Sequence, residues 1–169
     1  MENRRTLRQG DVKNAFCNGD LPPEETTIVR PPLGDPDADK NEFWLLRKTL
    51  YGLRRSLKHW YDKIARILRS FGLSPNAYDP CIFSGFVHDP SGPSDTPSQV
   101  PLIVGLYVDD FVYFSTSDEV EAKFERLLAA EVPVDFMGTW SGSSVSVSCR
   151  ASLMTTLTST RTSLALPAT

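Results

Sequence analysis

The stretch LIVGLYVDDFVYFST, residues 102–116, decides the fold class. Two runs of aliphatic, β-branched and aromatic residues flank Asp109 and Asp110, which predicts a β-hairpin with this acidic pair at its turn. Aspartate is common in turns, so a simple polar turn is one interpretation. The strands are apolar nearly up to the carboxylates, however, so these charges are predicted at the edge of a core. That position favours a functional role.

Strands and helices alternate on both sides of this hairpin. Within residues 5–16 a short strand is predicted to end at Asp11 or just past it. Further strands are expected at residues 26–30, 43–46 and 81–87. Such an order predicts an α+β fold, with an antiparallel sheet and helices on one face.

Two helices are predicted from the spacing of apolar residues and from capping residues. The first follows Ser56, a candidate N-cap, ends before Gly72, and has an apolar face formed by Trp60, Ile64, Ile67, Leu68 and Phe71. The second follows the hairpin, where Thr116 and Glu119 have capping-box spacing.

Composition sets the domain boundaries. Residues 88–101 contain four prolines in fourteen positions, and we expect a flexible surface loop there. In residues 140–169, fourteen of thirty residues are Ser or Thr, and we expect a disordered tail. Residues 1–139 are therefore predicted to form the folded domain.

Charge is unevenly distributed along the chain. The net charge is -3, but residues 47–69 hold eight basic side chains and one acid, a local charge of +7 that leaves -10 elsewhere. This basic segment could contact phosphates or could be a solvated helix face. No run approaches the ~20 apolar residues of a membrane span. The three scattered cysteines fit neither a zinc site nor a disulfide framework and favour a reducing compartment.

Asp11, Asp109 and Asp110 are the candidate catalytic residues. Each lies at or beside the end of a predicted apolar strand, and carboxylates at neighbouring strand ends form a hard-oxygen site suited to Mg²⁺. Such carboxylates can hold two ions about 4 Å apart, one activating the attacking oxygen and one stabilising the leaving group.

Four motifs together carry a family resemblance. They are DVKNAFCNGDL (11–21), LYGLRRSLKHWYDK (50–63), Asp79-Pro80-Cys81 and LYVDD (106–110). In this order and approximate spacing, across residues 7–139, they resemble the reverse transcriptase of copia-type LTR retrotransposons. The resemblance implies a polymerase palm region that extends a primer on an RNA or DNA template with dNTPs. It also implies two Mg²⁺ ions as cofactors, with Mn²⁺ as the alternative, bound by Asp11, Asp109 and Asp110.

The resemblance assigns further residues to the substrates. Phe16 matches the aromatic residue that excludes the ribose 2′-OH, although a buried core Phe is the alternative. Val12 and Ala15 are expected to line the nucleotide pocket through their backbone, and Tyr107 to touch the primer end. Other assigned residues are Arg55 for the nucleotide and Arg54 and Lys58 for the template–primer backbone.

The chain departs from the family in three ways. Arg55-Ser56-Leu57 replaces a usual Gln-Ala-Pro, whose Gln helps to hold the nucleotide. We expect this segment to lack the family's fingers, thumb and ribonuclease H domain, and therefore expect no polymerisation by this chain alone. Residues 140–145 read Trp-Ser-Gly-Ser-Ser-Val, which a one-base shift of codons for Val-Glu-Trp-Phe-Leu-Gly produces. We therefore hypothesise that the tail is translated out of frame.

Two other functions fit the same residues. One is a non-catalytic remnant that retains some nucleic-acid binding, and the other is an unrelated Mg²⁺-dependent phosphotransfer enzyme. The family resemblance implies a cytoplasmic virus-like particle as the location and no membrane association. No sequence feature indicates an oligomeric state.

Overall fold

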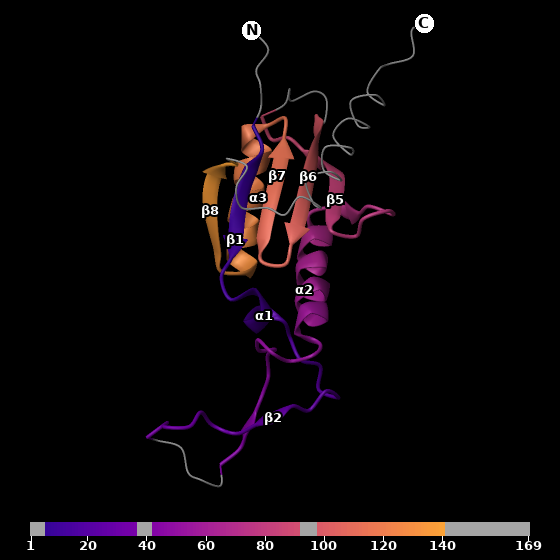
Figure 1. Ribbon diagram of the computed structural model, residues 1–169. Coiled ribbons are helices and arrows are strands. Elements are labelled where there is room, and N and C mark those ends of the chain that lie inside the picture. The colour runs from indigo at the N-terminus through magenta and orange to yellow at the C-terminus, as the bar shows by residue number, and fades with distance from the viewer. Residues whose placement is uncertain (1–5, 37–41, 92–97, 141–169) are drawn as a thin grey trace, which may run out of the picture. The chain divides into compact units, whose positions relative to one another are not determined.

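The computed structural model describes residues 6–36, 42–91 and 98–140. Six strands form one sheet in the order β4-β5-β6-β7-β1-β8, and all neighbouring strands are antiparallel (Figure 1). The strands are β1 (Arg8–Val12), β4 (Ser74–Pro75), β5 (Ile82–His88), β6 (Gln99–Tyr107), β7 (Asp110–Ser115) and β8 (Val134–Thr139). With the helices α1 (Ala15–Asn18), α2 (Ser56–Ser70) and α3 (Asp118–Glu131), this architecture confirms the predicted α+β class.

The chain divides into two compact units. One comprises residues 1–13 and 65–169 and contains the sheet, and we call it the sheet unit. The other is Asn14–Ile64, which we call the insert unit. The boundary between them falls inside the sequence of α2.

Helix α3 covers one face of the sheet (Figure 1), and aromatic side chains form the core beneath it. Phe124 of α3 packs against Phe111 and Tyr113 of β7, with ring centroids 6.4 and 5.1 Å apart, and against Phe71 at 5.5 Å. Phe136 of β8 completes the cluster, 6.0 Å from Phe111. Phe111, Tyr113 and Phe124 are almost fully buried, so this face supplies much of the apolar burial of the sheet unit.

Gly10 lies under this aromatic cluster. A Cβ built at Gly10 would lie 2.4 Å from Cζ of Phe111, closer than atoms can pack. Gly10 is the register partner of Phe111, so β1 approaches β7 at a point where only glycine leaves room for the ring.

The opposite face of the sheet holds a smaller apolar cluster. Ile82, Ile103 and Val112 are buried there, and Leu7 and Trp140 pack against them. The Trp140 N–H donates to the Leu7 carbonyl oxygen at 2.8 Å. Trp140 is the one described residue of the expected tail, and the predictions for residues 141–169 concern residues outside the described part of the chain.

The helix α2 follows the sequence prediction closely. Trp60, Ile64, Ile67 and Leu68 are buried as expected, and Phe71 is half-buried beside Phe124. Gly72 has φ +84°, the left-handed conformation that favours glycine after a helix. Ser56 differs from the prediction: it is the first helical residue, and its hydroxyl donates to the Leu50 carbonyl oxygen at 2.5 Å.

The N-cap of α3 also differs from the prediction. Ser117, not Thr116, is the N-cap, and its hydroxyl accepts the N–H of Val120 at 3.4 Å. The predicted Thr116–Glu119 capping box is therefore wrong, because the N-cap lies one residue later and the residue at N3 is Val120. Asp118 and Glu119 lie in the first turn, where their negative charges interact favourably with the positive end of the helix dipole.

The loop expected at residues 88–101 is shorter in the structure. Strand β5 continues to His88 and β6 begins at Gln99. Residues 92–97 lie outside the described ranges. The helices of the described part include none that is both long and apolar enough to cross a bilayer.

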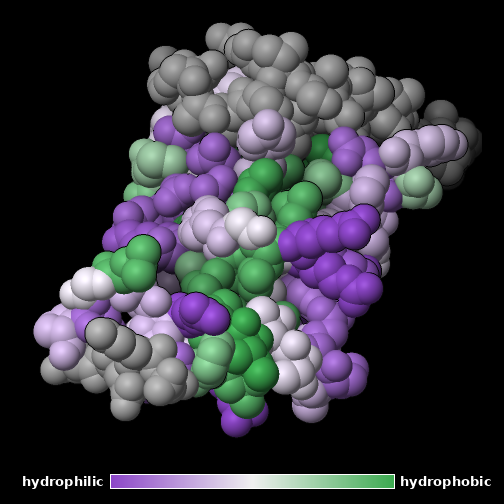
Figure 2. Space-filling model, turned by 60° about the horizontal axis from the view of Figure 1, so that its bottom comes forward, coloured by the Kyte–Doolittle hydropathy of each residue, from purple (hydrophilic) through white to green (hydrophobic). Residues whose placement is uncertain are grey.

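Regular structure is sparse in the insert unit. The strands expected at 26–30 and 43–46 shrink to a two-stranded pairing of β2 (Ile28–Val29) with β3 (Trp44–Leu45). Figure 2 shows green, hydrophobic residues at the molecular surface between purple, hydrophilic ones. The insert unit contributes large exposed apolar side chains of this kind, namely Ile28, Leu33, Phe43, Trp44, Leu45, Leu50, Tyr51 and Leu57.

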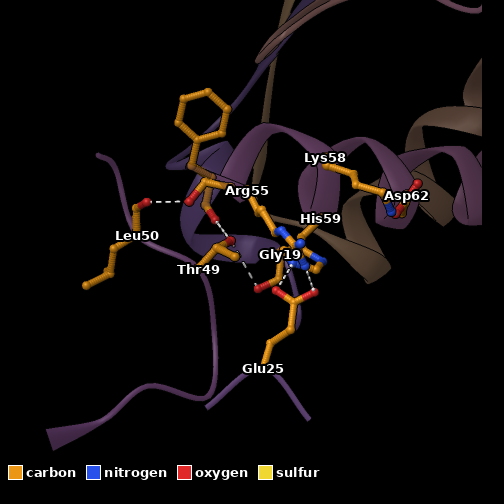
Figure 3. Close-up of polar contacts among 10 residues, drawn as sticks. Gly19, Glu25, Thr49, Leu50, Arg55, Lys58, His59 and Asp62 are labelled. Carbon is orange, nitrogen blue, oxygen red and sulfur yellow. Dashed lines mark hydrogen bonds and ion pairs between the residues drawn. The ribbon is translucent and has the colours of Figure 1, made fainter. Parts of the chain in front are cut away.

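Polar contacts to the backbone hold the insert unit together. The Thr49 hydroxyl donates to the carbonyl oxygen of Phe16 and lies 3.3 Å from that of Gly19, and the Thr49 N–H donates to Gly19 at 2.9 Å. Thr49 is fully buried. A single residue therefore connects α1 and the glycine after it to the segment that leads into α2 (Figure 3).

Candidate active site

The β6–β7 hairpin and strand β1 bring the predicted aspartates together. The hairpin turns through Val108 and Asp109, so Asp110 is the first residue of β7. Asp11 is the cross-strand register partner of Asp110. The Val12 N–H donates to the Asp109 carbonyl oxygen at 2.9 Å. Because hydrogen-bonded and non-hydrogen-bonded pairs alternate, Asp11 and Asp110 form a non-hydrogen-bonded pair, whose side chains lie closer together on one face.

The turn itself has an unusual backbone. Val108 has φ +59°, and Asp109 is not among the described residues with positive φ. A positive φ at the first central residue is the pattern of a type II′ turn, where glycine is preferred. A β-branched residue in this conformation is strained, and such strain is common at functional sites.

The aspartates repel one another within the sheet unit. Partial burial raises the pKa of Asp110 above its ordinary value, and the charges of Asp109 and Asp11 raise it further. Burial also raises the pKa of Asp11, with added repulsion from Asp109 and Asp135, while Lys13 opposes the rise. Nearby positive charge is therefore too weak to cancel the repulsion among these carboxylates. A bound cation would reduce that repulsion and lower their pKa values.

Asp135 is a fourth carboxylate that the sequence interpretation missed. It lies in β8 as the register partner of Asp11, on the side away from Asp110. Its Oδ1 is 2.9 Å from Nζ of Lys13. The only available signal was the alternation of Val134, Asp135 and Phe136, which is typical of a strand with one buried face.

The donor set suits divalent metal ions in chemistry. Carboxylate oxygens are the ligands that Mg²⁺ and Mn²⁺ accept, and Asp11, Asp109 and Asp110 supply them from adjacent backbone segments. Within residues 6–36, 42–91 and 98–140, no three acidic, histidine or cysteine side chains already converge as a metal-binding group. The site is therefore a set of neighbouring carboxylates and not a preformed cage.

Other predicted substrate residues occupy varied environments. Tyr107 ends β6 opposite Asp110 and is 47% exposed. Val12 is buried, and its N–H is already used by Asp109. In the insert unit, Ala15 is buried in α1, and the ring of Phe16 contacts that of Tyr51 edge-on at 4.9 Å.

The insert unit contains a carboxylate, that of Glu25, with two basic side chains bound to it. Glu25 accepts from Arg55 Nη1 at 2.8 Å through Oε1, and its Oε2 lies 2.9 Å from His59 Nε2 (Figure 3). The hydrogen bond with His59, aided by that from Arg55, lowers the pKa of Glu25. Arg55, assigned to the nucleotide by resemblance, is thus engaged by an acid of its own unit.

Acids also engage other members of the basic segment at residues 47–69. Lys58 Nζ is 2.6 Å from Asp62 Oδ2 one helical turn away, and Lys63 Nζ is 3.7 Å from Asp20 Oδ2. Arg54 is exposed. Part of the predicted phosphate-binding charge is therefore neutralised within the insert unit.

Comparisons with known proteins agree with the motifs. A family model described as reverse transcriptase (RNA-dependent DNA polymerase) matches residues 1–145. The chain is 29% identical over 133 residues to the Pol polyprotein of transposon TNT 1-94 from Nicotiana tabacum, covering 78% of this chain and 9% of that protein. It is 36% identical over 78 residues to that of transposon RE1 from Arabidopsis thaliana, covering 46% and 5%.

A third relative comes from yeast. The chain is 29% identical over 117 residues to the Ty1-MR1 Gag-Pol polyprotein of Saccharomyces cerevisiae, covering 68% of this chain and 6% of that protein. The chain thus spans less than a tenth of the length of these relatives. No solved structure matches it.

Proposed function

Because this chain belongs to the reverse transcriptase (RNA-dependent DNA polymerase) family, we propose that it is the catalytic-aspartate segment of a copia-type retrotransposon polymerase. The reaction proposed is nucleotidyl transfer, in which the primer 3′-OH attacks the α-phosphate of a dNTP and pyrophosphate leaves. The observation that carries the proposal is the register pairing of Asp11 with Asp110, beside Asp109 in the turn.

The three aspartates would bind the cations of this reaction. Two Mg²⁺ ions held by Asp11, Asp109 and Asp110 would lower the pKa of the primer hydroxyl and neutralise charge on the leaving pyrophosphate. Repulsion among these carboxylates, seen in the raised pKa values of Asp11 and Asp110, supports a cation-binding role.

The remaining residues would position the substrates. Tyr107, exposed at the end of β6, would contact the primer end. Phe16 would pack under the nucleotide sugar, and the backbone at Val12 and Ala15 would line the pocket. Arg54 and Lys58 would meet template–primer phosphates, a contact that weakens as salt concentration rises.

We also propose that this chain does not polymerise DNA alone. Positioning of both substrates supplies much of a polymerase's rate, and the chain matches only 9% of a Pol polyprotein. The ion pair of Arg55 with Glu25 favours the alternative of a non-catalytic remnant, because it occupies the group assigned to the nucleotide. The proposed location is a cytoplasmic particle, as inferred from the relatives.

A primer-extension assay tests these proposals. The chain is incubated with an RNA template, a DNA primer and dNTPs in Mg²⁺ or Mn²⁺, beside Asp109→Asn as the inactive control. Glu131→Gln is the matched control, since it removes an exposed carboxylate at the end of α3. Extension by the chain and by Glu131→Gln but not by Asp109→Asn would overturn the claim of inactivity and support the catalytic site.

Metal binding separates the remnant from a dormant catalytic site. Free Mn²⁺ is measured by electron paramagnetic resonance during titration of the chain and of Asp109→Asn. We expect Mn²⁺ binding that the substitution weakens, even where no extension occurs. Equal Mn²⁺ binding by both proteins would contradict the proposed metal site.

A further inference from the structure

Arg8 links strand β1 to helix α3 on the face of the sheet away from the aspartates. Its Nη1 lies 2.7 Å from Glu125 Oε1 and 3.5 Å from Glu121 Oε2. Its guanidinium also lies over the ring of Tyr113, 5.8 Å from the centroid. Arg8 is the register partner of Tyr113, as Asp11 is of Asp110 three residues later.

Both glutamates are themselves fixed to β7. Glu121 is buried and accepts the Ser115 N–H at 2.9 Å, while Glu125 accepts the Tyr113 hydroxyl at 2.5 Å. Burial raises the pKa of Tyr113, so its phenol remains protonated and donates. The carboxylates that receive Arg8 are thus already positioned relative to the strand that carries Asp110.

On the α3 face, β1 has one packing constraint besides Arg8, which is the room that Gly10 leaves for the ring of Phe111. A glycine has no side chain that could hold the strand to α3. The ladder of β1 with β8 shifts between Gln9 and Gly10, where Gly138 has φ +75°. Arg8 is therefore the side chain on this face that ties β1 to another element.

A slip of β1 by one residue would move Asp11 to the other face. Side chains alternate along a strand, so Asp11 would then point toward the aromatic core around Phe111 and Phe124. The pair with Asp110 would be lost with no change at either aspartate.

We propose that Arg8 is a positioning residue that sets the register of β1 and thereby holds Asp11 beside Asp110. It acts through Glu121 and Glu125 and touches no substrate. The inference deepens the proposed function, on which its metal-binding consequence rests, while the register itself is independent of it.

The test uses Arg8→Met, which keeps length and loses the charge. Non-hydrogen-bonded partners in antiparallel strands bring their Hα atoms close, so the full chain should show an Asp11–Asp110 Hα–Hα nuclear Overhauser effect. In Arg8→Met we expect this signal to weaken or vanish and the Mn²⁺ dissociation constant to rise about tenfold, as for outer residues that orient metal ligands.

Two variants control the result. Arg126→Met removes an exposed arginine of α3 and should leave both readouts unchanged. Arg8→Lys retains the charge and should restore most of the Hα–Hα signal. Arg8→Met could fail to fold because it leaves the carboxylates of Glu121 and Glu125 without their positive partner. In that case the triple variant Arg8→Met/Glu121→Gln/Glu125→Gln replaces it, and the same loss of the Hα–Hα signal and of Mn²⁺ affinity is expected.

The outcomes separate the two proposals. An Asp11–Asp110 signal and Mn²⁺ affinity equal to those of the parent chain in Arg8→Met, or in the triple variant that replaces it, would overturn the role of Arg8. A parent chain that shows the signal but binds no Mn²⁺ would overturn the proposed metal site, and the signal alone would then decide the role of Arg8.

Discussion

The sheet unit and the insert unit hold their side chains in opposite ways. In the sheet unit, aromatic rings are buried together, while Asp11 and Asp110 have raised pKa values that Lys13 offsets only in part at Asp11. In the insert unit, large apolar side chains are exposed while Glu25 is compensated by Arg55 and His59. Packing can stabilise a fold that carries repelling charges, whereas a sparsely packed segment depends on satisfied polar groups. Strain and repulsion are therefore concentrated where the core can support them.

The largest test of this contrast is the loss of a core ring. Phe124→Ala removes the ring that joins Phe71, Phe111 and Tyr113, and should cost about 3–5 kcal/mol of unfolding free energy. Leu33→Ala in the insert unit, at a fully exposed position, should change it by less than about 0.5 kcal/mol. Urea denaturation measures both, and equal losses would contradict the contrast.

The next test removes repulsion from the sheet unit. The folded-state pKa of Asp110 is raised, so its penalty to folding is absent below its ordinary pKa of 3.8 and present above the folded-state value. Asp110→Asn should therefore raise the melting temperature at pH 7 and leave it unchanged at about pH 3. Asp62→Asn, which breaks an ion pair with Lys58, should give no such rise. A melting temperature lowered at pH 7 by Asp110→Asn would show that the repulsion does not exist.

A smaller effect is expected at the hairpin turn. Val108→Gly relieves the positive φ, worth about 1–3 kcal/mol, but loses about 0.5–1 kcal/mol to glycine's freedom in the unfolded chain. The net expectation is stabilisation of about 1 kcal/mol. Val108→Ala retains a Cβ and should stabilise less. Urea denaturation that ranks alanine above glycine would argue against strain at this residue.

The smallest effect is expected from the compensated acid. The folded-state pKa of Glu25 is lowered, so its stabilisation is present above the unfolded value of 4.5 and is lost as pH falls through the lower folded-state value. Glu25→Gln should slightly lower the melting temperature at pH 7 and match the parent chain in stronger acid. Glu24→Gln is the neighbouring control. A deficit that persists unchanged in strong acid would exclude this origin.

Much of the sheet unit could be predicted from local pattern. The hairpin at Asp109 and Asp110 and the strand ending past Asp11 carry strong periodicity, as does α2, whose sequence both units share, and the structure has each of them. Strand β8 was not predicted, because six residues with half-buried alternation give little signal until their partner strand is known. Asp135 was missed with it.

The insert unit was harder to predict for a physical reason. Its contacts join residues far apart in sequence, such as Thr49 with Phe16 and Glu25 with His59. Such pairs leave no periodic trace, so the predicted strands were too long and the engagement of Arg55 went unforeseen. The one-residue error at Ser117 reflects two adjacent hydroxyls, either of which could cap the helix.

The room that Phe111 takes above Gly10 has a genetic consequence. Any base change at the first or second codon position of a glycine gives a larger residue or a stop, whereas every third-position change is silent. Gene copies that remain under selection for this fold should vary at that codon only in its third base. A copy with another amino acid at position 10 would identify itself as released from selection, even if its aspartates were still intact.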